Sequence, residues 1–177
     1  KVSDVIIREE ITLEIQNAIC SCFDQLLDIY KIAKYDYPMS ELEQLEKYLW
    51  TKFFNLRLSK YDYDSFSIPG CIEAPFVQWY EILDLIEVSI KYIHQRDDTF
   101  GRSASIRFAK LLNSEFERLN FAYRIVNYEI VEITSEQEIK AIEKAIESSP
   151  QNVKMHLNSA LEKLAQRPNG DNRNSIK

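Results

Sequence analysis

One long stretch with apolar residues at helical spacing does most to constrain the fold. From Phe76 to Ile93, apolar side chains recur three or four residues apart, and others stand beside them (Phe76, Trp79, Leu83, Ile86, Ile90 and Ile93, with Ile82, Leu85 and Val88). This spacing predicts a helix with a wide apolar face, so we expect it to be the central and most buried helix. Pro75 suits its first turn, and a break is expected at 95–101.

Narrower apolar stripes predict further helices on both sides of this one. Before it, one helix is expected at 12–31, closed by Tyr-Asp-Tyr-Pro38, and a second from Ser40, which forms a capping-box pattern with Glu43. After it, a helix is expected at 102–120, with Phe108, Leu112, Phe116 and Leu119 inward. Two more are expected, one from Thr134 or Ser135, with Ile139, Ile142 and Ile146 inward, and one from Pro150, with Val153, Leu157, Leu161 and Leu164 inward. The polar and aromatic segment 58–74 is predicted to be an ordered loop.

The stretch 123–133 interrupts the helical pattern. Residues 123–126 and 129–133 are rich in β-branched and aromatic side chains, which predicts a two-stranded hairpin turning at Asn127. Tyr128 suits a tight turn poorly, because a positive φ is costly for it, so both a tight turn and a longer or distorted turn stay open. The predicted fold is therefore all-α, a bundle of about six helices with one small β-hairpin insertion.

The length and composition of the chain limit the classes of protein to which it can belong. A length of 177 residues suits one domain, and a net charge of −6 argues against a dedicated nucleic-acid binder while allowing a local basic patch. No apolar run reaches about 18 residues, so we expect no membrane span. The chain shows no signal peptide. Three cysteines without framework spacing indicate reduced thiols, two of them filling the core, in a cytoplasmic protein.

Carboxylates are plentiful in the sequence, but few patterns indicate a metal or catalytic site. His94 and His156 are the only histidines and fall on different predicted helices, which predicts no metal site, and we expect no cofactor. Glu81, Asp84 and Glu87 stand at i, i+3 and i+6, a spacing that a solvated helix face produces more often than a catalytic centre does.

Basic residues gather around the predicted helix at 102–120. The candidates for binding an anion or a partner are Arg102, Arg107, Lys110, Arg118 and Arg124. The same residues are also what the outer face of such a helix would carry, and Gly101 ahead of them is only weak support for an anion site. Tyr61, Tyr63 and Phe66 in the loop either stack on a base or cover the core, and the second reading is favoured.

Several motifs, taken in order, resemble a known family. They are Gln78–Glu87, with its Trp79 and Asp84-Leu85-Ile86-Glu87; Leu119–Val126 running into Glu129–Thr134; the acidic segment 136–146; and His156–Leu164 leading to Asn172–Lys177. Together they are similar to an N-terminal domain of AbiJ-like abortive-infection proteins of bacteria, over residues 6–177. Tyr128 departs from the pattern, where Gly is expected.

The resemblance implies a role in phage defence. In that family the domain precedes a helical HEPN domain, often a ribonuclease, so 1–170 would be a sensor or regulatory domain and 171–177 the start of a truncated HEPN domain. A HEPN active site needs an Arg shortly before a His, and neither His94 nor His156 has one, so no catalytic residue is assigned. The implied partners are the HEPN domain, a phage-derived protein or nucleic-acid trigger, and a second copy through HEPN; no membrane is implied.

Two other functions stay open at this point. One is a passive scaffold for protein–protein contact, which a large apolar surface patch without a polar cleft would favour. The other is an enzyme with an unrecognised site, which a pocket joining buried carboxylates to the region of Arg107 would favour. If the chain is a passive scaffold or a regulatory domain, we expect that it is not itself an enzyme.

Overall fold

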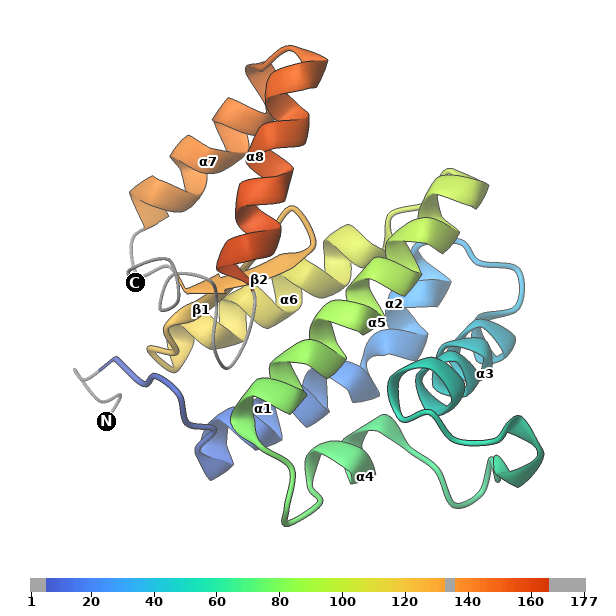
Figure 1. Cartoon of the computed structure of the whole chain (residues 1–177). Coiled ribbons are helices and arrows are strands. Elements are labelled where there is room, and N and C mark those ends of the chain that lie inside the picture. The colour runs from blue at the N-terminus through green and yellow to red at the C-terminus, as the bar shows by residue number, and fades with distance from the viewer. Residues whose placement is uncertain (1–5, 133–135, 166–177) are drawn as a thin grey trace.

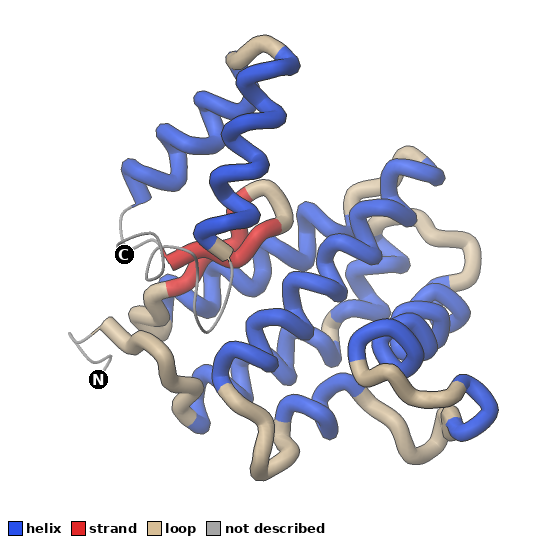
Figure 2. Tube along the Cα trace, viewed as in Figure 1, coloured by secondary structure: helices blue, strands red, loops and turns tan. Residues whose placement is uncertain are grey.

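The protein is an all-α bundle with one small β-hairpin, as predicted (Figures 1 and 2). This computed structural model describes residues 6–132 and 136–165. Within this part of the chain, no helix has both the length and the apolar character needed to cross a membrane. The predicted start of a following domain at 171–177 lies outside the described residues.

The first predicted helix is two helices, α1 (Leu13–Asp24) and α2 (Leu26–Ile32). Thr12 caps α1 by accepting a hydrogen bond from the backbone N–H of Ile15, and the break falls at Gln25. The apolar stripe continues across the break because both helices face the same core, as the complete burial of Ile19 and Leu26 shows. A break of this kind leaves the sequence periodicity almost unchanged.

The second predicted helix begins earlier than expected. α3 (Pro38–Tyr48) starts at Pro38, so the prediction of a cap at Ser40 was wrong. The ring of Pro38 fixes a φ suited to a first helical turn, and Ser40 lies inside the helix, where its hydroxyl accepts a hydrogen bond from Gln44. A single π-turn, η1 (Leu49–Phe53), follows α3.

The segment 58–74 contains more structure than a loop. It holds a short 3₁₀ turn, η2 (Leu58–Lys60), and a short helix, α4 (Ile68–Ile72). Ser67 caps α4 by accepting from the backbone N–H of Gly70 at 3.1 Å. The helix was missed because its single turn is too short to give a periodic pattern.

The central helix, α5 (Trp79–Phe100), differs from its prediction at both ends. It begins after a capping box of Gln78 and Glu81, so Pro75 precedes it, and Phe76 is 79% exposed instead of inward. It also continues through the predicted break and ends at Gly101, whose φ of 62° is the left-handed conformation that glycine adopts without strain. Its central position is confirmed, since Leu83, Ile86, Ile90 and Ile93 are fully buried.

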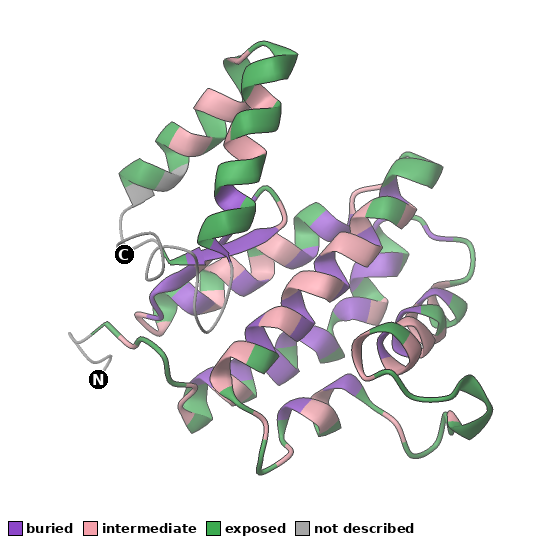
Figure 3. Cartoon of the chain, in the orientation of Figure 1, coloured by how far each residue is buried: buried purple, intermediate pink, exposed green. Residues whose placement is uncertain are grey.

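α6 (Ala104–Arg118) packs against α5 and presents the predicted inner face. Phe108, Leu112 and Phe116 are fully buried, whereas Leu119 follows the helix and is half-buried. In Figure 3 the purple, buried stretches of α5 and α6 mark where the main core lies.

The hairpin consists of β1 (Tyr123–Val126) and β2 (Glu129–Glu132), paired antiparallel with Val126 opposite Glu129. The turn is therefore the tight two-residue one, not the longer turn that the sequence also allowed. Asn127 and Tyr128 both have positive φ, 48° and 67°. The Tyr128 ring stacks on His94 of α5, with ring centres 3.8 Å apart, and this contact offsets the backbone cost.

Replacing Tyr128 tests this balance between ring stacking and backbone strain. Tyr128→Ala keeps the costly backbone and loses the ring, so we expect it to lower the free energy of unfolding by about 2 kcal/mol. Tyr128→Gly also loses the ring but adopts the turn without strain, so it should cost about 1 kcal/mol less than Ala. Urea unfolding of both variants measures the difference. A glycine variant less stable than the alanine variant would contradict this account.

The last two helices form a pair that projects from the body, as Figure 1 shows: α7 (Glu136–Ser148) and α8 (Gln151–Leu164). Leu161 packs with Val126 and Val131 of the hairpin in a second, small core. The predicted inner face of α8 is otherwise only partly correct, because Val153 and Leu164 are 40% and 47% exposed.

The starts of α7 and α8 differ in how far they can be compared with their predictions. Pro150 takes the capping position of α8, one residue before its predicted place. The predicted start of α7 at Thr134 or Ser135, and the predicted inward side chain of Ile139, lie outside the described residues.

Candidate functional site

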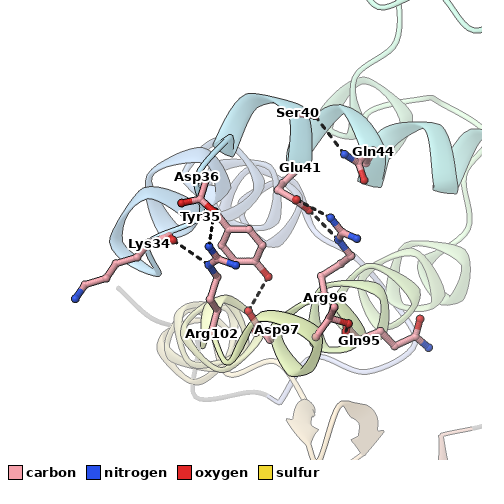
Figure 4. A network of polar contacts seen from close by, with 11 residues as sticks. Lys34, Tyr35, Asp36, Ser40, Glu41, Gln44, Gln95, Arg96, Asp97 and Arg102 are labelled. Carbon is pink, nitrogen blue, oxygen red and sulfur yellow. Dashed lines mark hydrogen bonds and ion pairs between the residues drawn. The ribbon is translucent and has the colours of Figure 1, made fainter.

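The basic residues predicted to bind an anion or a partner do not form one patch. Arg102 lies against the connection between α2 and α3 (Figure 4). Its guanidinium donates to the carbonyl oxygen of Lys34 and pairs with Asp36, both at 2.9 Å, and it lies 4.6 Å from the centre of the Tyr35 ring. Arg102 therefore links two parts of the fold instead of offering an open anion site.

Asp97, which no sequence pattern marks as a site residue, is the centre of the same network. Its carboxylate accepts from the Tyr35 hydroxyl at 2.9 Å and from the backbone N–H groups of Ala104 and Ser105 at 2.9 and 2.6 Å. It is 2% exposed, and it caps α6 from the last turn of α5. No local capping pattern predicts this, because Asp97 stands seven residues before the helix that it caps.

A second polar link in Figure 4 joins α5 to α3. Arg96 donates two hydrogen bonds to the carboxylate of Glu41, at 3.0 and 2.7 Å. The side chain of Glu41 is largely buried. Because two nitrogens of the guanidinium bind two oxygens of the carboxylate, this ion pair fixes the orientation of α5 relative to α3.

Arg118 and Arg124 also have structural partners. Arg118 forms an exposed ion pair with Glu115 on the same helix, one turn away. Arg124 is half-buried and donates to the backbone carbonyl oxygens of Phe121 and Tyr123. Burial lowers the pKa of its guanidinium from the ordinary value. Neither arrangement indicates a ligand.

Arg107 and Lys110 are the two predicted residues that point into solvent. Both lie on the outer face of α6, and no ion pair found in 6–132 and 136–165 involves either of them. Lys110 also lines a cleft between α6, the hairpin and α7.

This cleft encloses about 370 Å³, within the range of ligand-binding pockets. α6 contributes one wall, the hairpin the floor and α7 the other wall. The lining residues are Ile106, Ala109, Lys110 and Asn113 of α6, Ile125, Asn127 and Tyr128 of the hairpin, and Glu143, Ile146 and Glu147 of α7.

Charge and apolar surface are distributed unevenly in the cleft. The lining carries Lys110 on α6 and Glu143 and Glu147 on α7, together with apolar side chains of all three elements. Asn113 is held in place, since its amide accepts from and donates to the backbone of Ile125 at 2.8 and 2.9 Å. The arrangement suits a ligand with both charges and an apolar part, and its lining offers no thiol or imidazole for nucleophilic chemistry.

The structure separates Glu87 from the other two carboxylates predicted along α5. Glu81 and Asp84 line a different cavity, near the start of α5. Glu87 accepts from the backbone N–H of Ile130 at 2.9 Å, and Lys91 bridges Glu87 and Glu129 at 2.9 and 2.7 Å. Glu129 is the first residue of β2, so this group fastens the hairpin to α5. Neither cavity joins buried carboxylates to Arg107.

The three candidate aromatic side chains of the segment 58–74 differ in their surroundings. Phe66 packs edge-on against Trp50, with ring centres 5.3 Å apart, and Tyr61 donates to Glu46 at 2.9 Å. Both therefore have partners within the fold, whereas Tyr63 is exposed.

The cysteine thiols lie where the sequence places them. Cys20 and Cys22 are buried in the core as predicted, and burial raises the pKa of Cys20 to about 11. No group of three or more His, Cys, Asp or Glu side chains able to hold a metal occurs in the described part of the chain.

Together, the fold and the cleft define a helical domain in which a C-terminal helix pair rests on a β-hairpin. The family model described as AbiJ N-terminal domain 4 matches residues 1–148, and the chain belongs to this family. Membership relates it to abortive infection, a bacterial defence against phage. The matched region ends with the last residue of α7, so α8 lies beyond it. Comparison with curated proteins and with solved structures gave no match.

Proposed function

We propose that the chain is the sensor or regulatory domain of an abortive-infection protein and controls a C-terminal HEPN ribonuclease of the same protein. The observation that carries this proposal is the cleft between α6 and α7. One of its walls belongs to a helix pair that contacts the rest of the fold mainly at the hairpin. A ligand in the cleft would touch both parts, so it would favour one position of the pair and shift the effector between two states.

The charges of the cleft favour a protein trigger over a nucleic acid. Glu143 and Glu147 would repel phosphate groups, whereas a protein segment can present a cation to them and an anion to Lys110. The overall charge of −6 acts in the same direction. On this proposal the chain binds and does not catalyse, and it works in the cytoplasm, where a phage protein would be met.

A passive scaffold is the weaker alternative. Large exposed apolar side chains occur on several elements, for example Leu13 on α1, Phe76 before α5 and Met155 on α8. Single exposed apolar residues are ordinary on protein surfaces, whereas interaction scaffolds present contiguous patches. A polar cleft beside a projecting helix pair supports regulated binding better. Pairing of two copies would come from the HEPN part.

Charge reversal across the cleft tests the proposal in the full-length protein. In a bacterial host challenged with a panel of phages, we expect Lys110→Glu, and separately the double variant Glu143→Lys with Glu147→Lys, to reduce protection at least about 10-fold. Combining all three changes restores opposite charges across the cleft and should recover part of the protection. Efficiency of plating is the measurement.

The matched control is Lys60→Glu, an exposed charge reversal in η2, away from the cleft. It should protect like the wild type. Growth arrest without phage in the reversal variants would also support control of an effector. Full protection and normal growth in every cleft variant would contradict the proposal.

A further inference from the structure

A second cavity lies near the start of α5, on the side of the fold where η1 and α4 pack, away from the projecting helix pair in Figure 1. It encloses about 500 Å³, again the size of a ligand-binding pocket. Phe53 and Phe54 line it from η1 and its end, Cys71 from α4, and Tyr80 from the first turn of α5. Three aromatic side chains therefore line the cavity, together with aliphatic ones.

The local backbone explains why aromatic rings gather here. η1 is a π-turn, in which the backbone N–H of Phe54 reaches the carbonyl oxygen of Leu49 five residues back. The wider turn leaves Phe53 and Phe54 packed edge-to-face, with ring centres 5.0 Å apart. π-turns are rare in helices and occur frequently at functional sites. A regular α-helical turn would place these two rings differently.

The charged residues that line this cavity are both acidic. Glu81 and Asp84 stand one turn apart on α5 and contribute carboxylates to an otherwise mostly apolar lining. One carboxylate oxygen of Glu81 accepts a hydrogen bond from the backbone N–H of Gln78 at 2.8 Å. The partial positive charge at the N-terminal end of α5 is therefore balanced by Glu81 itself. An anionic ligand would therefore be repelled, whereas a cation gains from the carboxylates and from the faces of the rings.

We propose that this cavity binds an arginine or lysine side chain presented by a protein segment. The aliphatic part of that side chain would pack on Phe53, Phe54 and Tyr80, and its charged end would meet Asp84 and Glu81. Phe76 precedes Val77 of the cavity lining and is 79% exposed. An apolar residue next to the inserted arginine or lysine in the bound segment could pack on the Phe76 ring. The site is separate from the α6–α7 cleft and does not depend on its role.

Cys71 serves as a reporter inside the cavity. Burial, followed by the charge of Glu46, raises the pKa of its thiol to about 11, so alkylation is slow and an occupied cavity should slow it further. The probe is a blocked tripeptide with arginine between phenylalanine and leucine. Two matched peptides carry citrulline, which is neutral, or glutamate in place of arginine. The folded full-length protein is alkylated at about pH 9 and then digested. Mass spectrometry of the peptide that contains Cys71 gives the alkylation rate of this thiol alone.

The arginine peptide should slow alkylation of Cys71 at concentrations about 10-fold lower than the citrulline peptide, and the glutamate peptide should have no effect. Asp84→Asn should remove this preference, while Glu147→Gln, in the other cleft, should keep it. Glu81→Gln gives a second variant that retains a capping side chain for α5. Equal protection by all three peptides, or none by any of them, would overturn the proposal, whatever the outcome of the phage test.

Discussion

We expect Asp97→Ala to lower the free energy of unfolding by about 3–5 kcal/mol. The carboxylate is buried and accepts from the Tyr35 hydroxyl and from two backbone N–H groups at the start of α6. Its removal leaves these donors without a partner where water cannot reach them easily. Domains of this size are stable by about 5–15 kcal/mol, so the variant would lose a large fraction of its stability.

Urea unfolding followed by circular dichroism measures the loss. Asp97→Asn keeps one acceptor oxygen but turns an amide toward donors, so an intermediate loss of about 2 kcal/mol is expected. The control is the adjacent Asp98→Ala, since the Asp98 side chain is mostly exposed and should change stability by no more than about 0.5 kcal/mol. Equal losses at both positions would refute the assigned role of Asp97.

The second large effect is a dependence of stability on pH that originates at Glu129. Burial, together with the charge of Glu87, raises the pKa of Glu129 from 4.5 to about 7, although Lys91 opposes the shift. Between these two values the folded state holds the proton that the unfolded state has released. The stability due to this group is therefore complete below about pH 4.5 and is lost as pH rises through about 7.

Glu129→Gln removes the titrating group and should flatten this dependence. Relative to the variant, the wild type should lose at most roughly 3 kcal/mol between about pH 5 and about pH 8. Urea unfolding at the two pH values gives the difference, and comparison with the variant cancels other titrating groups. Glu132→Gln is the control, because Glu132 is exposed and its ion pair with Arg8 is open to solvent. Parallel pH profiles for wild type and Glu129→Gln would rule out Glu129 as the source.

Much of the fold could be predicted because apolar periodicity reports burial directly. The stripe of Leu83, Ile86, Ile90 and Ile93 located the central helix, and the β-branched run at 123–132 located the hairpin. Helix ends were less predictable, because they depend on which of several competing caps is used. Pro38 rather than Ser40 begins α3, and Gln78 rather than Pro75 precedes α5.

The candidate site could be predicted only in part, for a different reason. A basic side chain on a helix is equally compatible with an open surface and with a partner far away in sequence. Arg102 meets Lys34 and Asp36 across more than sixty residues, which no local pattern reveals. Lys110 reached the cleft because α7, connected through the hairpin, folds back opposite it.

The position of the α7–α8 pair has a mechanical consequence. α8 has 14 residues, which makes it roughly 21 Å long, and its buried contacts with the hairpin gather near its C-terminal end, at Leu161 and Ala165. A rotation of about 10° about that end would move the opposite end by roughly 3–4 Å. Small rearrangements around Val126 and Val131 would thus be magnified at the tip of the pair, where a second protein surface could detect them.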